Sequence, residues 1–66
     1  MKNFIKEERT RLYLTQVQLA EKVNVSRQTI ISIENSRYIP SVLLSLKLAA
    51  VLNKKVEALF VLEKSD

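Results

Sequence analysis

The sequence predicts a small all-α domain of five helices, with a short terminal β-ribbon as an alternative for its two ends. Apolar residues recur at helical spacing in several short segments, and residues that favour helix starts precede these segments. Asparagine or proline follows most of them, where a helix must end. A chain of 66 residues is near the lower size limit for a core without disulfides or metal. We therefore expect one domain over residues 1–66.

The composition excludes several classes of chemistry. The chain has no Cys and no His, which excludes disulfides, thiolate or imidazole metal sites, and Ser-His-Asp or Cys-His catalysis. We therefore expect no enzyme activity, no metal and no cofactor. Eleven Lys and Arg against seven Asp and Glu give a net charge of +4, which favours a polyanionic partner.

A membrane location is not expected. The longest apolar stretch, residues 42–52, is interrupted by Ser45 and Lys47 and is too short to span a bilayer. No signal peptide precedes the globular pattern. A reducing, cytoplasmic location fits a chain without cysteine.

Residues 16–35 predict two short helices joined by a tight turn. The inward apolar stripe breaks at Asn24, which tolerates the left-handed backbone that closes a helix. It resumes with a new phase after Ser26, a good N-cap residue. One continuous helix cannot change phase in this way, so we expect separate helices over residues 16–23 and 27–35.

The join between these helices has the features of a helix-turn-helix. Thr15 and Gln18 form a capping box at the start of the first helix. The small Ala20 stands where the two helix axes must cross closely, and the turn has only three or four residues. The second helix of such a motif normally enters a DNA major groove.

Further helices flank this motif. Asn3 can cap a first helix over residues 4–12, whose Phe4, Ile5 and Leu12 should lie in the core. Ser41, after Pro40, predicts the start of a fourth helix over residues 42–52. This helix should be nearly buried, with Ser45 and Lys47 outward and a core set of Leu43, Leu46, Ala49, Ala50 and Leu52. Asn53 can end it, and a brief fifth helix follows with an inner face of Val56, Leu59 and Phe60.

The chain contains no glycine, although it needs four tight turns. Asn24 and Asn53 can adopt the left-handed conformation that glycine usually supplies. Tyr13 and Ser36 either store strain in that conformation or use ordinary backbone angles. The sequence leaves both alternatives open.

These features together resemble the Cro and lambda-repressor-like helix-turn-helix family, also called the XRE family. The resemblance covers about residues 5–60 and rests on the pattern TQxxLAxxxxVSRQTIxxIE. It implies a five-helix lambda-repressor-like DNA-binding domain, similar to compact stand-alone regulators of the cytolysin-repressor type. Such regulators lack a separate ligand-binding or dimerisation domain. The chain departs from the family at four positions that usually hold glycine, namely Tyr13, Asn24, Ser36 and Asn53.

The outer face of the second motif helix presents the candidate base-reading residues, since Ile30 and Ile33 face the core. They are Arg27, Gln28, Ile31 and Ser32. Arg27 suits the two acceptors of guanine, Gln28 suits the donor and acceptor of adenine, and Ile31 can touch a thymine methyl group. The alternative is a solvated helix face without a target, for which an exposed isoleucine is less expected.

Candidate phosphate contacts lie at the ends of the two motif helices. They are Gln16, Asn35, Arg37 and Tyr38. Gln16 stands where free N–H groups and the helix dipole favour an anion, although simple helix capping is an equal alternative. The family resemblance also implies an ion pair between Arg9 and Glu34 that ties the first helix to the end of the third.

These observations predict a sequence-specific transcriptional regulator that acts as a repressor on a palindromic operator in double-stranded DNA. A protein-interaction role, as an antitoxin or adaptor with the same fold, is the alternative, and it would favour a larger exposed apolar patch. A chain this small leaves no room for an effector pocket of drug size, so we expect no small-molecule effector.

The regulator should be a homodimer, because one recognition helix reads too few base pairs to find an operator. Residues 56–62 are the expected dimerisation segment, with Phe60, Val61 and Leu62 at the interface. These residues either pack against a second copy as a helix end or form a short strand that pairs with residues 1–3. Folding of Leu62 back onto its own chain is the simpler alternative.

Overall fold

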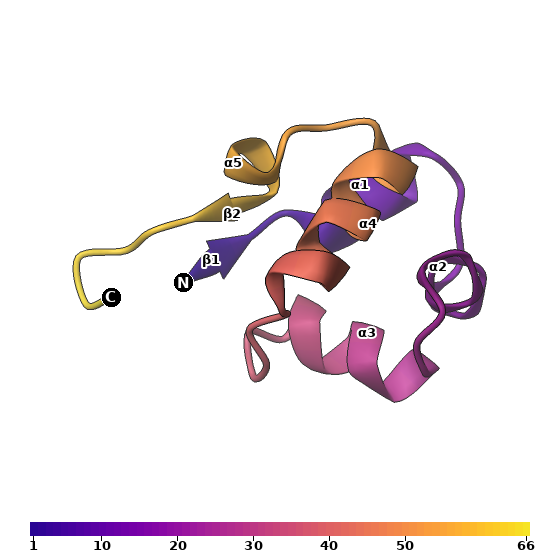
Figure 1. Ribbon diagram of the computed structural model, residues 1–66, viewed down its shortest axis with the longest axis horizontal. Coiled ribbons are helices and arrows are strands. Elements are labelled where there is room, and N and C mark those ends of the chain that lie inside the picture. Colours follow the sequence, from indigo (N-terminus) through magenta and orange to yellow (C-terminus); the bar gives the residue numbers. More distant parts are fainter.

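The computed structural model describes residues 1–66 and consists of five helices and one two-stranded sheet (Figure 1). The all-α prediction with a terminal ribbon is confirmed. The elements in chain order are β1 (Lys2–Asn3), α1 (Ile5–Arg11), α2 (Gln16–Val23), α3 (Arg27–Glu34), α4 (Val42–Leu52), α5 (Val56–Leu59) and β2 (Phe60–Val61). None of the helices is long and apolar enough to cross a membrane.

Helix starts follow the predicted caps in three of the five helices. The Thr15 hydroxyl accepts from the Gln18 amide N–H at 3.0 Å, and the Gln18 side chain accepts from the Thr15 N–H at 2.8 Å. Ser26 caps α3 through the Thr29 N–H, and Ser41 caps α4 through the Leu44 N–H. Each cap satisfies a backbone donor that the helix itself leaves free.

The first helix is shorter than predicted, and Phe4 rather than Asn3 is its N-cap residue. The Asn3 side chain still accepts from the Ile5 N–H at 3.2 Å, while its amide donates to the Ile33 carbonyl at 2.8 Å. Asn3 therefore joins the start of α1 to the end of α3. Of the three expected core residues, only Ile5 is fully buried, whereas Phe4 and Leu12 are half-buried.

The core contains ten apolar residues, and α4 supplies three of them. They are Leu44, Leu48 and Leu52, which repeat every four residues along one face. The predicted core face of α4 is therefore wrong for Leu43, Leu46 and Ala50, which are exposed, whereas Leu52 is buried and the half-buried Ala49 packs against the core. The helix is apolar on nearly every side, so its sequence contains no polar stripe that would fix its rotation.

All four turn positions without glycine adopt the left-handed conformation. The φ angles are 58° at Tyr13, 60° at Asn24, 59° at Ser36 and 55° at Asn53. The open question at Tyr13 and Ser36 is therefore settled in favour of strain, because a Cβ atom crowds the following carbonyl in this region. The same residues mark where the family usually has glycine.

Replacing Tyr13 with glycine should stabilise the fold by up to about 1 kcal/mol. The backbone strain that is removed should exceed the conformational entropy that glycine adds to the unfolded chain. The Tyr13 ring is almost fully exposed, so little burial is lost. Urea unfolding of Tyr13→Gly beside Asn24→Gly would measure this. Asn24→Gly should gain less, since asparagine tolerates the conformation. A Tyr13→Gly variant less stable than the wild type would contradict the strain.

The two chain ends form an antiparallel ribbon, as the strand alternative predicted (Figure 1). Lys2 pairs with Val61 and Asn3 pairs with Phe60. Phe60 also packs against the core of its own chain, whereas Leu62 is largely exposed and does not fold back. The ribbon lies beside α5, and the chain beyond it extends away from the helices.

Candidate nucleic-acid interface

The recognition helix α3 is fixed by burial of one face and by the turn that precedes it. Ile30 and Ile33 are completely buried, and Ala20 on α2 is buried where the two helices meet. Asn24 in the left-handed conformation ends α2, so the backbone changes direction before Ser26 starts α3. These constraints leave the outer side of α3 at the protein surface, as the sequence predicted.

The predicted base-reading residues differ in exposure. Arg27 and Gln28 in the first turn are exposed. Ile31 and Ser32 are half-buried, so the isoleucine is less exposed than the sequence predicted. The helix ends at Glu34, one residue earlier than predicted, and Asn35 is its exposed C-cap.

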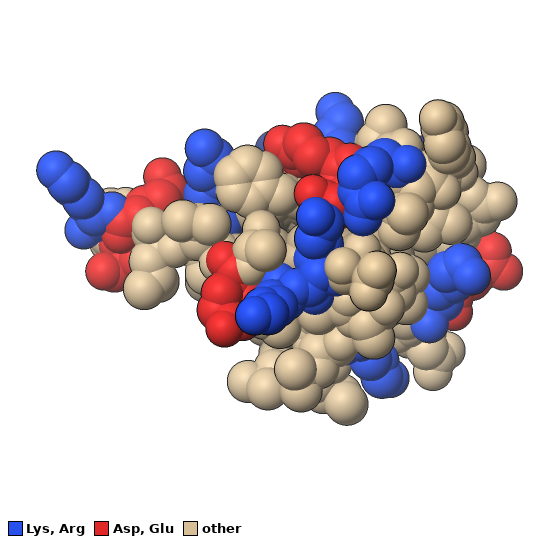
Figure 2. Space-filling view, turned by 90° about the horizontal axis from the view of Figure 1, so that it is seen from above, with Lys and Arg blue, Asp and Glu red and all other residues tan.

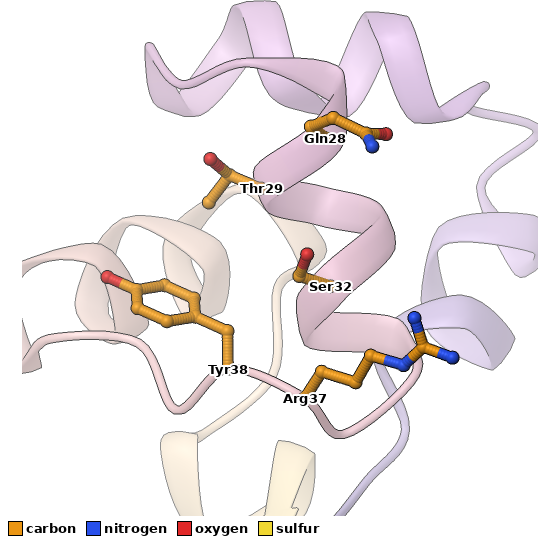
Figure 3. Close-up of a pocket in the computed structure, with 5 residues that line it drawn as sticks. All are labelled: Gln28, Thr29, Ser32, Arg37 and Tyr38. Carbon is orange, nitrogen blue, oxygen red and sulfur yellow. The ribbon is translucent and has the colours of Figure 1, made fainter.

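A surface hollow of about 260 Å³ lies against the outer side of α3 (Figure 3). Gln28, Thr29 and Ser32 follow one another along the helix, and Arg37 and Tyr38 flank its C-terminal end. The structure thus brings together two predicted base readers and two predicted phosphate contacts. The other four candidates do not line this hollow. They are Gln16, Arg27, Ile31 and Asn35.

Thr29 belongs to this hollow, although the sequence did not single it out. Its hydroxyl lies 3.0 Å from the Ser26 hydroxyl, so the two side chains share a hydrogen bond at the start of α3. A second hollow of about 270 Å³ also has Thr29 and Tyr38 in its lining and extends to Leu43 and Lys47 on α4. The outer side of α3 is therefore continuous with the N-terminal half of α4.

Gln16 is tied to the base of this surface by a part-buried ionic network. Glu34 accepts from Arg9 Nε at 2.7 Å and from the Gln16 amide at 3.2 Å. Arg9 also donates to the Leu14 carbonyl at 2.8 Å. The side chains are only 12% exposed for Arg9 and 4% for Glu34. The expected Arg9–Glu34 ion pair is present, and it holds Gln16 in the first turn of α2.

The charge around α3 is strongly one-sided. Arg27 at the start of α3 and Arg37 beyond its end are exposed, whereas the only acid of the helix, Glu34, is part-buried and paired with Arg9. Figure 2 shows the molecule from the side opposite α3, and there acidic and basic groups alternate. A positive surface around a helix with exposed amide and guanidinium groups is the electrostatic footprint of nucleic-acid binding. The fold and this surface together define a DNA-binding helix-turn-helix protein.

Comparisons with known proteins agree with this class. The helix-turn-helix family model matches residues 5–59. An HTH-type transcriptional regulator, YgzD of Bacillus subtilis, is 44% identical over 66 residues and covers all of both chains. An HTH-type transcriptional regulator of Methanothermobacter thermautotrophicus is 45% identical over 65 residues, which are 97% of this chain and 94% of that protein.

A solved structure gives the same result. The restriction-modification controller protein C.AhdI of Aeromonas hydrophila superimposes with a TM-score of 0.78 at 30% identity and covers 85% of each chain. The chain therefore belongs to the helix-turn-helix family, in its XRE branch of Cro and lambda-repressor-like proteins. The resemblance that the sequence pattern indicated is confirmed.

Proposed function

We propose that this helix-turn-helix transcriptional regulator is a repressor that binds a palindromic operator as a homodimer. The observation that carries the proposal is the hollow beside α3, where Gln28 and Ser32 adjoin Arg37 and Tyr38. Side chains that read base edges and side chains that hold phosphates must reach the same duplex at once. Bound at an operator, the protein would block access of the polymerase.

Each group of residues has its own role in this proposal. Arg27, Gln28, Ile31 and Ser32 read base edges from α3, and Arg27 and Gln28 are free to do so because both are exposed. The phosphate contacts are Gln16, Asn35, Arg37 and Tyr38. The Gln16 amide nitrogen donates one of its two N–H groups to Glu34, which leaves the other N–H to donate to a phosphate. These contacts set the register of the protein on the duplex.

The homodimer provides the second recognition helix. Two α3 helices on half-sites one turn of DNA apart, about 34 Å, read enough base pairs for an operator. We propose that the C-terminal segment 56–62 contributes to this dimer. Within it Val61 and Leu62 are exposed and available to a second copy, while Phe60 also packs on its own core.

We further propose that no small molecule, metal or cofactor controls the protein, that it is not an enzyme and that it acts in the cytoplasm. The largest hollow, about 490 Å³, is lined by only four residues, Leu12, Leu14, Lys22 and Val51. A specific effector site needs several convergent polar groups, and this hollow offers one. Control would then come from the protein's concentration or from competition at the operator.

The alternative is a protein-interaction role, as an antitoxin or adaptor. The observation that favours it is a set of exposed apolar side chains at the start of α4, among them Val42 and Leu43. An exposed apolar patch of this kind marks a protein contact. It is compatible with the DNA-binding proposal, because neither Val42 nor Leu43 lines the hollow beside α3, although Leu43 adjoins Thr29 and Tyr38 in the second hollow.

Selection of bound sites from a random double-stranded DNA pool tests the function. We expect enrichment of an inverted repeat whose half-site centres lie about 10 base pairs apart. A control variant with Arg27 and Gln28 both replaced by alanine should lose its preference at two positions of each half-site. Recovery of unrelated sequences by the wild type, with no repeat, would count against sequence-specific binding.

A further inference from the structure

One side of α4 carries an apolar stripe that its own core does not use. We define the α4 stripe as Ile39, Val42, Leu43, Leu46 and Ala50. Its four large side chains are 56% to 76% exposed, although they lie within eight consecutive residues. Val42, Leu46 and Ala50 repeat every four residues, two positions away from the buried Leu44, Leu48 and Leu52. These three residues therefore lie on the side of α4 opposite the core, while Leu43 lies toward Thr29 and Tyr38 and Ile39 precedes the helix.

The stripe is held in place by the surrounding structure. Pro40 is buried between the exposed Ile39 and the N-cap residue Ser41. Ser41 fixes the first turn of α4 through the Leu44 N–H. The apolar side chains thus project from a rigid helix, so that little conformational entropy is lost when they become covered.

We propose that the α4 stripe is the contact surface for a second copy of this chain, with the two α4 helices crossing antiparallel about a two-fold axis at Leu46. This inference rests on the proposed function, because it supplies the second α3 helix that an operator requires. It adds a central contact that the C-terminal segment alone does not provide.

The sequence of α4 is complementary to itself about this axis. Leu46 meets the partner's Leu46, and the larger Val42 meets the small side chain of the partner's Ala50. The only charge of the helix, Lys47, lies opposite the partner's Ser45, so the two cations do not face each other. An isologous interface needs such a match of a surface with its own copy.

The size of the molecule is also consistent with a second copy as the occupant. A stable interface covers about 800 Å² on each partner, which is about a sixth of the total surface of 4645 Å². The stripe supplies the apolar centre that such an interface needs. With only ten residues in its own core, the chain also gains buried apolar area by pairing.

Analytical ultracentrifugation of the full chain without DNA tests this surface. We expect the wild type to be a dimer at micromolar concentration. Leu46→Glu should raise the dissociation constant of the dimer at least about tenfold, because two carboxylates would meet on the axis. Val17→Glu is the matched control, since Val17 is 49% exposed on α2, and it should leave the dimer unchanged.

A mixture of two variants identifies the occupant. Leu46→Glu and Leu46→Lys should each be monomeric, whereas an equal mixture should restore a dimer, since opposite charges then meet on the axis. Far-UV circular dichroism checks that both variants are folded. If either has lost its helical signal, Val42→Lys and Ala50→Glu, which face each other across the axis, replace the pair in the mixture. A monomeric wild type, or folded variants whose mixture stays monomeric, would overturn the proposal.

Two further measurements distinguish the α4 interface from the C-terminal interface and from the proposed DNA-binding function. A Leu62→Asp variant that is monomeric, beside a Leu46→Glu variant that stays dimeric, would place the interface at the C-terminal segment and overturn the α4 stripe. Binding of the wild type to selected DNA is measured on its own. Loss of sequence preference there would refute the proposed function and leave the ultracentrifugation result as it stands.

Discussion

Replacement of Glu34 by glutamine is expected to destabilise the domain by about 3 kcal/mol, because it leaves the Arg9 guanidinium partly buried without its carboxylate. The two side chains are among the least exposed charged groups of the chain, and Arg9 Nε lies 2.7 Å from Glu34 Oε2. For a domain of this size the melting temperature should fall by on the order of 12 °C or more. Thermal unfolding followed by circular dichroism would measure the change.

An exposed ion pair serves as the control for this experiment. Glu8 lies 2.6 Å from Arg11 Nε on α1, and the hydrogen bond from Arg11 lowers the pKa of Glu8 below its ordinary value. Because solvent screens this pair, Glu8→Gln should leave the melting temperature almost unchanged at neutral pH. Equal losses in Glu34→Gln and Glu8→Gln would show that burial does not set the cost.

The Glu34 variant also has a consequence for the DNA surface. Glu34 accepts from the amide of Gln16, so its loss releases a predicted phosphate contact at the start of α2. Below the melting transition we expect weaker binding to all DNA sequences and an unchanged order of preference among them. The ionic network therefore connects the stability of the helix-turn-helix with its register on the duplex.

Local chemistry explains which parts of the fold the sequence could predict. The Thr15–Gln18 capping box, the Ser26 cap and the left-handed Asn24 depend on residues within a few positions of one another. The boundaries of α2 and α4 therefore agree with the prediction. The α3 boundary differs by one residue, which is the usual uncertainty at a helix end.

Features that depend on packing between distant parts of the chain could not be predicted from local sequence. The rotation of α4 requires knowledge of which neighbours cover it, because apolar residues surround the helix. The predicted core set therefore left out Leu44 and Leu48, which are buried. The left-handed Tyr13 and Ser36 are imposed by the direction the chain must take after α1 and α3. Tertiary structure thus decided the cases in which local preference was weak or unfavourable.

The candidate site shows the same division. The residue types on α3 predicted base reading, and the structure places Gln28 and Ser32 in one hollow with Arg37 and Tyr38, whose roles on DNA stay predictions. Thr29 escaped notice because its place depends on how the loop after α3 folds back. Ile31 is half-buried, which its position on the outer side of α3 did not predict.

Substitution of Arg27 by alanine is expected to relax base choice at one position of the half-site, at a cost of about 1–3 kcal/mol in binding the preferred base pair. Arg27 is exposed in the first turn of α3, where its guanidinium can donate to both acceptors of a guanine. Gln28→Ala should act in the same way at an adenine. Repeating the site selection with each variant would reveal which position loses its preference.

Arg37→Ala is the matched control, since it removes the same type of side chain from the loop beyond α3. As a phosphate contact, Arg37 should contribute equally to every sequence, so this variant should weaken binding uniformly and keep the selected consensus. The slope of log binding constant against log salt concentration should become shallower by about one, because one fewer phosphate is neutralised. The opposite pattern, an intact consensus for Arg27→Ala and a changed one for Arg37→Ala, would reverse the two roles and show that the loop reads the bases.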